Sequence, residues 1–227
     1  MKSVIVGLGE IGHSLYRALV PYYRETTLVG RNGAYDKGND ILHITFPYSD
    51  SFSSQVAKYQ EFYTPAYTVI HSTVPPGTSR KLGAIHSPII GIHPHLEESL
   101  KTFTKFLGGT AAHMVADYFR KAGIKVYLFD NPETTELMKI LDTTFYGVCV
   151  EYTKEVKRQC AERGVPFEAW SLWVDAYNRG YEKLGYGEFR RPNLVPIMTL
   201  LGGHCVKENC DFLDSRWTKL IKELNTT

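Results

Sequence analysis

The stretch Val4-Ile-Val-Gly-Leu-Gly-Glu-Ile-Gly12 decides the fold. An apolar run typical of a buried strand leads directly into Gly-x-Gly-x-x-Gly, and apolar residues at helical spacing follow it (Ile11, Leu15, Ala18, Leu19). In this pattern Gly7 permits the tight turn, Gly9 lets the backbone approach a pyrophosphate, and Gly12 lets the helix pack closely on the strand. The helix that begins at Glu10 offers free N–H groups to the phosphates. The stretch therefore predicts a site for NAD or NADP, with contacts from Gly7, Gly9, Glu10, Ile11 and Gly12.

The chain has 227 residues and a formal net charge of +2, with no block of like charge. This balance gives no signal for a nucleic-acid or membrane partner, so we expect a small-molecule substrate. The apolar start at Val4 reads as the first strand and not as a leader peptide, and no segment approaches the length of a membrane span. The cysteines (Cys149, Cys160, Cys205 and Cys210) form no secreted-type framework, which favours a reducing cytoplasm.

Residues 1–131 read as alternating strands and helices. After the first strand and helix we expect strands at 26–30, 40–47, 67–71, 88–92 and 125–129, a helix at 51–63 capped by Asp50 or Ser51, and a helix stopped by Gly123. This alternation predicts an α/β fold whose first domain, 1–131, is a doubly wound Rossmann domain. Ligands gather beyond the carboxyl ends of parallel strands, so Pro47 and Thr73, which follow two of these strands, should face the cofactor.

After Asn131 the pattern becomes helical. Long helices are predicted at 132–163 and 166–184, and another at 211–224, with a loop rich in Gly, Pro and Arg at 185–196. We expect a small all-helical domain at 132–227 that binds substrate and forms a homodimer.

The second strand ends at Val-Gly-Arg-Asn, where Rossmann folds select between the two nicotinamide cofactors. Arg31 offers a guanidinium to a 2′-phosphate and favours NADP. NAD remains an alternative cofactor, because an acidic residue in this region, Asp36 or Asp40, would accept a hydrogen bond from the ribose hydroxyl.

Two positions in the helical region are candidates for catalytic residues. Gly202-Gly-His-Cys205 places a thiol after two glycines, as a nucleophile that attacks an aldehyde or as a small buried cysteine. Lys139 lies beside the predicted domain boundary and would protonate or polarise a substrate oxygen, or else pair with Glu136 on the helix surface. A zinc site at His204, Cys205 and Cys210 has irregular spacing, so we expect no metal.

The helix from Glu136 to Glu155, the Ser72-Thr73-Val74-Pro75 loop and Gly202-Gly203-His204-Cys205 together resemble the nucleotide-sugar 6-dehydrogenases of the UDP-glucose and UDP-N-acetylmannosamine type. The resemblance implies that Lys139, Thr73, Glu155 and Cys205 are catalytic, and that His95, Thr143 and His204 contact substrate. It runs through nearly the whole chain in order, and it implies a dimer.

Several positions depart from that family's pattern. Thr143 and Lys154 stand where it has asparagines, Asn209 stands where it has aspartate, and His93-Pro94-His95-Leu96 replaces Ser-Pro-Glu, with Glu97 or Glu98 as substitute carboxylates. Members of the family continue into a UDP-binding domain, and this sequence ends at Thr227, so we do not expect recognition through UDP.

The broader resemblance is to the 6-phosphogluconate dehydrogenase-like NAD(P)-dependent oxidoreductases, and it implies oxidation or reduction of an alcohol or aldehyde on a small polar, sugar-like or acidic substrate. Arg190 and Arg191 would clamp an anionic group of that substrate. One alternative is hydride transfer of the prephenate dehydrogenase type using His93. The other is a non-catalytic protein that senses the cofactor.

Overall fold

The computed structural model describes residues 1–30, 33, 37–197 and 206–225. Contacts within the chain divide it into two compact units, Met1–Lys139 and Ile140–Thr227.

The described part of the first unit is built on a seven-stranded sheet in the order β2-β1-β3-β4-β5-β6-β7. Neighbouring strands from β2 to β5 are parallel, β6 runs antiparallel to β5, and β7 is parallel to β6. The four strands β1, β3, β4 and β2 therefore end at one common edge, which is where such folds bind ligands. The strands are β1 (Ser3–Val6), β2 (Thr26–Val29), β3 (Ile41–Ile44), β4 (Tyr67–Ile70), β5 (Ile85–His86), β6 (Lys105–Gly108) and β7 (Val126–Phe129).

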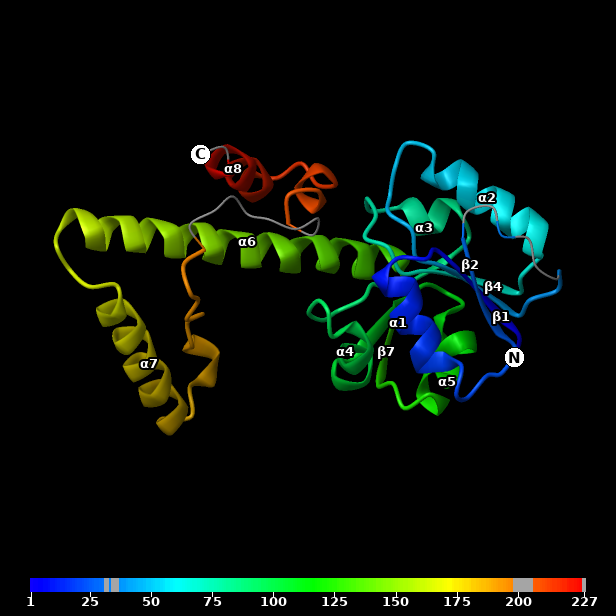
Figure 1. The fold of residues 1–227 in the computed structure, drawn as a ribbon, viewed down its shortest axis with the longest axis horizontal. Coiled ribbons are helices and arrows are strands. Elements are labelled where there is room, and N and C mark those ends of the chain that lie inside the picture. Colours follow the sequence, from blue (N-terminus) through cyan, green and yellow to red (C-terminus); the bar gives the residue numbers. More distant parts are fainter. Residues whose placement is uncertain (31–32, 34–36, 198–205, 226–227) are drawn as a thin grey trace. The chain divides into compact units, whose positions relative to one another are not determined.

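Helices cover both faces of the sheet, which confirms the doubly wound α/β architecture (Figure 1). Ile5 and Val69 point to the face covered by α1, α4 and α5, whereas Val4, Val6 and Ile70 point to the face covered by α2 and α3. This alternation explains why the strands are apolar on both sides. The helices are α1 (Glu10–Leu19), α2 (Phe52–Tyr63), α3 (Thr78–Lys81), α4 (Leu96–Thr102) and α5 (Ala112–Lys121).

The predicted strand at 88–92 is wrong. The strand is β5, two residues long and just upstream, and its ladder with β4 ends where the Ser87 N–H donates to Ile70 O. Pro88 has no N–H to continue the ladder, so the apolar run after it is buried without pairing at 88–89. Sequence analysis also does not predict α4 or β6. Ser51 occupies the N-cap position of α2 as expected, but its side chain accepts from Gln55 Nε2 and does not cap the helix.

The helical part of the chain begins with α6 (Pro132–Glu162), whose bounds match the prediction and whose residues from Ile140 onward belong to the second unit. It continues with α7 (Glu168–Lys183), short 3-10 turns η1 (Gly187–Phe189) and η2 (Asn209–Asp211), and α8 (Arg216–Leu224). The helix predicted from residue 211 starts at Arg216, because Ser215 caps it by accepting from the Thr218 N–H. The small core of the second unit joins α6 to α8 and consists of Val150, Val206, Cys210 and Ile221.

We find no helix in the described ranges that is both long enough and apolar enough to cross a membrane.

Candidate functional site

The glycine turn has the geometry that its sequence predicts. Gly7 adopts a φ of +128° and its N–H donates to Val29 O at 2.9 Å, closing the turn after β1. A Cβ on Gly12 would lie 1.9 Å from Gly7 O, so the helix packs against the turn at a distance that only glycine allows. A Cβ on Gly9, in contrast, would meet no atom of the chain within 4 Å. Gly9 therefore faces open space at the start of α1, where a phosphate would lie.

Hydrogen bonds tie the three neighbouring strand ends together. Thr45 Oγ1 donates to Val6 O at 2.9 Å, and Ser72 Oγ donates to Phe46 O at 2.5 Å. The glycine turn after β1, the Pro47 loop after β3 and the Thr73 loop after β4 thus form one connected edge. Pro47 is exposed and Thr73 is half-buried on it, so both are accessible to a ligand.

The Ser72–Ser79 segment is held by the beginning of α6. The carboxylate of Glu136, fully buried, accepts the N–H of Gly77 at 2.6 Å and that of Ser79 at 2.8 Å. Glu136 is buried and does not lie on the helix surface, where the alternative reading of Lys139 placed it, and its carboxylate holds the loop. Sequence reasoning missed this role, since one glutamate in a helix carries no signal of a partner 57 residues away.

His86 is a second link between this loop and α6. Its Nδ1 lies 2.8 Å from Thr135 Oγ1 and its Nε2 lies 3.2 Å from Ser72 O. Burial lowers the pKa of His86 to about 3, against the hydrogen bond to Ser72, and the charges of Lys105 and Lys139 lower it further. Lys139, half-buried, follows Thr135 and Glu136, the two residues of α6 that hold this loop.

His93 contacts the first residue of the predicted phosphate-binding helix. Its Nδ1 lies 2.5 Å from Glu10 Oε2, and both side chains are partly exposed. Of the two substitute carboxylates, Glu97 pairs with Arg17 of α1 at 2.9 Å, and Glu98 lies 3.4 Å from Nδ1 of the exposed His95. The 93–98 segment therefore packs against α1 and not only against its own helix.

Of the three residues expected to select the cofactor, the structure describes only Asp40. Arg31 and Asp36 lie outside the described residues. Asp40 precedes β3, and its carboxylate accepts the Lys2 N–H at 2.8 Å. It lies at the amino edge of the parallel strands, opposite the glycine turn, so Asp40 is not placed to read a ribose.

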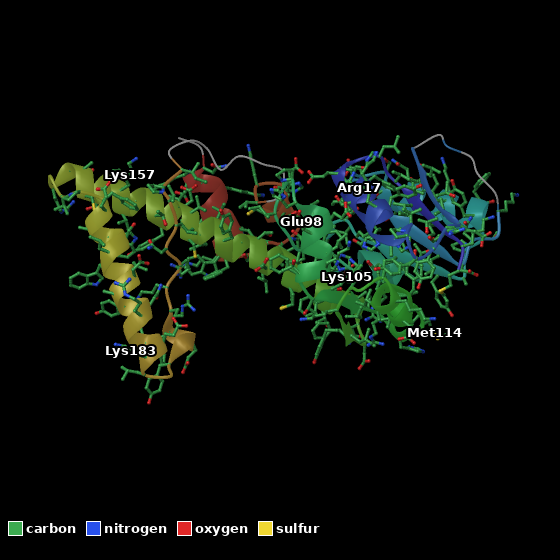
Figure 2. The ribbon with its side chains drawn as sticks, turned by 60° about the horizontal axis from the view of Figure 1, so that its bottom comes forward. Arg17, Glu98, Lys105, Met114, Lys157 and Lys183 are labelled. Atoms are coloured by element: carbon green, nitrogen blue, oxygen red, sulfur yellow. The ribbon has the colours of Figure 1, made fainter. Side chains whose placement is uncertain are left out.

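A buried basic cluster lies under α5 in the first unit. His43 Nδ1 and His71 Nε2 are 3.0 Å apart. Lys105, labelled in Figure 2, has its Nζ 3.2 Å from both His71 Nδ1 and Ser87 O. Burial lowers the pKa of Lys105 to about 7, and burial followed by the charge of Lys105 lowers the pKa of His43 to about 3. His43 Nε2 has no hydrogen-bond partner among the described atoms. Neighbours thus satisfy both ring nitrogens of His71 but only Nδ1 of His43.

In the second unit, Thr143 and Asn209 contact each other. Thr143 Oγ1 donates to Ile140 O at 3.0 Å and accepts from Asn209 Nδ2 at 3.2 Å, and both residues are buried. Cys205 and His204 lie outside the described residues.

Arg190 and Arg191 are both exposed, but they differ in their contacts. The guanidinium of Arg191 lies 4.5 Å from the ring centroid of Tyr177 and 5.4 Å from that of Tyr181, and Asn178 hydrogen-bonds the Arg191 backbone on both sides. Arg190 approaches Glu182 at 4.0 Å. Arg191 is thus held on α7, whereas Arg190 has a loose surface contact.

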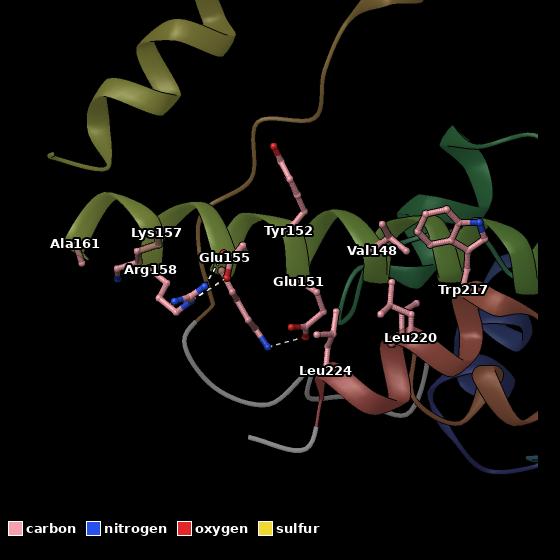
Figure 3. Close-up of a pocket in the computed structure, with 12 residues that line it drawn as sticks. Val148, Glu151, Tyr152, Glu155, Lys157, Arg158, Ala161, Trp217, Leu220 and Leu224 are labelled. Atoms are coloured by element: carbon pink, nitrogen blue, oxygen red, sulfur yellow. Dashed lines mark hydrogen bonds and ion pairs between the residues drawn. The ribbon is translucent and has the colours of Figure 1, made fainter. Parts of the chain in front are cut away.

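Glu155 lines a groove of about 740 Å³ between α6 and α8 (Figure 3). Its carboxylate pairs with Arg158 at 2.7 Å, and α8 contributes Trp217, Leu220 and Leu224 to the opposite wall. Within the described ranges no group of three or more His, Cys, Asp or Glu side chains is arranged to hold a metal ion.

The fold and the glycine turn define a Rossmann-type α/β protein, with a helical segment after the sheet. No family model matches the sequence. No curated protein matches it either.

Solved structures of dehydrogenases share this fold. Over 99% of the chain it is similar to the UDP-D-ManNAc dehydrogenase of Pyrococcus horikoshii, with a TM-score of 0.83 and 16% identity. The UDP-N-acetyl-mannosamine dehydrogenase of Staphylococcus aureus matches with a TM-score of 0.76 and 14% identity, again over 99% of the chain. The chain spans about two thirds of these proteins, 68% and 67% of their respective lengths. The 3-hydroxyisobutyrate dehydrogenase of Mycobacterium tuberculosis matches over 98% of the chain and 92% of its own, with a TM-score of 0.68 and 11% identity.

Proposed function

We propose that the chain is an NAD(P)-dependent oxidoreductase that acts on an alcohol or aldehyde of a small polar substrate, sugar-like or acidic. The observation that carries this proposal is the open space at Gly9, at the start of α1 and on the edge where β1, β3 and β4 end. A dinucleotide pyrophosphate needs this combination of a bare backbone, free N–H groups and a strand edge. The fold shared with dehydrogenases of nucleotide sugars and of a hydroxy acid supports the same assignment.

The reaction would use Lys139 as an acid or as a stabiliser of the substrate oxygen, with Thr73 on the adjoining loop. If the oxidation proceeds to an acid, the Cys205 thiolate would add to the aldehyde, a bound oxidised nicotinamide would serve as the hydride acceptor, and water would cleave the resulting thioester. The match of Gly202-Gly203-His204-Cys205 to the cysteine motif of the nucleotide-sugar dehydrogenases supports this role.

The helical segment would supply the other substrate contacts and a dimer interface. Arg191, held on the rings of Tyr177 and Tyr181, is the better supported of the two arginines as an anion clamp. Within α7, all of whose residues are described, Val174 is the single buried side chain, and Leu172 and Trp173 are 67% and 65% exposed. A helix of this length that buries so little against its own chain supports packing against a second copy.

The cofactor test is a fluorescence titration of the purified chain with NADH and with NADPH. We expect both to bind, NADPH more tightly, and Arg31→Ala to remove the preference. Equal affinities before and after the substitution would contradict the phosphate role of Arg31.

The reaction test follows nicotinamide absorbance at 340 nm with nucleotide sugars, sugar acids and 2- or 3-hydroxy acids as substrates. Turnover that is lost in Lys139→Met and, for four-electron oxidation, in Cys205→Ser supports the proposed roles. Turnover that survives both substitutions places the chemistry elsewhere, with His93 as the first alternative. Cofactor binding with no turnover on any substrate supports the sensor.

A further inference from the structure

Glu136 joins the loop after β4 to the helix that carries Lys139. Its side chain is fully buried, and each carboxylate oxygen accepts one backbone N–H, from Gly77 and from Ser79. Lys139 follows it by three residues on α6, a spacing that places the two side chains on neighbouring positions of one helix face. The position of the loop is therefore set by the same helical turn that positions Lys139.

The loop is also fixed at its other end. Ser72 Oγ donates to Phe46 O, and Ser72 O lies within hydrogen-bond distance of His86 Nε2. At the Glu136 end of the loop, Thr78 closes a turn by donating to Pro75 O through both its N–H, at 3.1 Å, and its Oγ1, at 2.6 Å. Thr73, half-buried, lies between the Ser72 anchor and the buried Val74, and the Glu136 anchor fixes the end of the same loop.

Strand order indicates which half of a dinucleotide this loop would meet. The glycine turn follows β1, β2 lies on one side of β1, and β3 and then β4 lie on the other. In doubly wound folds the dinucleotide lies across the strand ends with its pyrophosphate at the glycine turn, and the residue after the second strand reads the adenosine ribose. The nicotinamide half therefore extends toward β3 and β4, and toward Thr73.

We propose that Glu136 is a positioning residue that holds the Ser72–Ser79 loop against α6, so that Thr73 and Lys139 meet the nicotinamide half of the cofactor together. This inference rests on the proposed function. The site requires a carboxylate, because two N–H donors face its two oxygens, whereas a glutamine would present an NH₂ group to one of them.

The test compares two ligands in three variants. NADH, or NADPH if it binds more tightly, reports the whole dinucleotide, and ADP-ribose, or its 2′-phosphate, reports the half that lacks nicotinamide. In Glu136→Gln we expect the dissociation constant for the whole cofactor to rise about tenfold, the size of one lost charge-assisted hydrogen bond, while that for ADP-ribose stays within about twofold. Deuterium exchange of the amides at 77 and 79 should accelerate in the same variant.

Two further variants keep the test decisive. Glu133→Gln is the matched control, because it removes a partly exposed carboxylate of the same helix that pairs with Arg80, the residue after the loop, and it should change neither constant. Glu136→Asp keeps the negative charge on a shorter side chain and serves if Glu136→Gln does not fold. It should fold and raise the dissociation constant for the whole cofactor by less than about tenfold.

Equal losses for both ligands, or no loss for NADH, would overturn the positioning role and leave Glu136 as a structural residue alone. A wild-type chain that binds neither ligand would overturn the proposed function itself, and the inference with it.

Discussion

Asn209 Nδ2 donates a hydrogen bond to Thr143 Oγ1 at 3.2 Å, between buried residues that are 66 positions apart in the chain. Both positions depart from the nucleotide-sugar dehydrogenase pattern, in which they carry aspartate and asparagine. In this chain the two departures form one contact, so they are better understood as a paired exchange than as two separate losses.

Thr143→Val should reduce the free energy of unfolding by about 1–2 kcal/mol, because it leaves a buried amide donor of Asn209 unsatisfied. Asn209→Leu should cost a similar amount. In a double-mutant cycle followed by urea unfolding, the double variant should lose less than the two single variants added together, by about 1 kcal/mol. Simple additivity would show that the contact contributes nothing.

Glu10→Gln should tighten the binding of NADH and NADPH by about two- to fivefold, because it removes a negative charge beside the predicted pyrophosphate while the backbone N–H groups remain. Isothermal titration calorimetry at low ionic strength measures the change. Glu97→Gln is the control, since it removes a carboxylate that pairs with Arg17 on the same helix. Weaker binding in Glu10→Gln would mean that this carboxylate itself contacts the cofactor.

The buried Lys105 predicts an unusual dependence of stability on pH. Its pKa is about 7 in the folded chain and 10.5 when exposed, so the unfolded chain binds more protons between these values. The free energy of unfolding should therefore rise as the pH increases from about 7 to about 10. Lys105→Met should be more stable at pH 7 and should lose this rise, while Ser87 O keeps its bond to His71. A wild-type curve that is flat over this range would contradict a buried amine.

Below pH 6.5 the free energy of unfolding should again rise with pH, but here buried histidines are the cause and not Lys105. His43 and His86 are held neutral, with pKa values lowered from 6.5 to about 3, so the unfolded chain again binds more protons as the pH falls. Urea unfolding should show stability decreasing from pH 6.5 toward pH 4, in wild type and in Lys105→Met alike. Stability that increases on acidification would contradict the neutral state of these histidines.

Gly12→Ala should unfold the first unit at much lower urea concentration, with a loss of about 1–3 kcal/mol or more, because its Cβ would lie 1.9 Å from a backbone oxygen that cannot move away. Gly180→Ala is the control, because a Cβ at this position of α7 would meet no atom within 4 Å. Equal stability of Gly12→Ala and wild type would show that α1 does not pack on the turn as described.

Much of the fold follows from local pattern. The strand, glycine turn and helix at residues 3–19 are predictable because each glycine has a distinct steric role, and α6 is predictable because Pro132 and Gly164 mark its ends. The short strand β5 is not, since two residues carry no periodicity and the apolar run after Pro88 imitates a strand. The reversal of β6 is hidden as well, because its first residue is a buried lysine, the residue type expected at the surface.

The candidate site divides in the same way. Gly7, Gly9 and Gly12 belong to one local motif, and the structure shows their geometry directly. The contact of Glu136 with Gly77 and Ser79, that of His93 with Glu10, and that of Asn209 with Thr143 each join distant parts of the chain. No local spacing encodes such contacts, so only the folded chain reveals them. Cys205 and Arg31 stay predictions.

Gly9→Val places a side chain where the glycine turn would receive the pyrophosphate. Gly9 has φ of −73° and ψ of 178°, which valine adopts readily, and its Cβ would enter open space, so the fold should tolerate the substitution. We expect unchanged urea unfolding together with binding of NADH and NADPH weakened by at least about tenfold, because the side chain would occupy the place of the pyrophosphate. Unchanged affinity in a folded Gly9→Val chain would contradict a dinucleotide site at this turn.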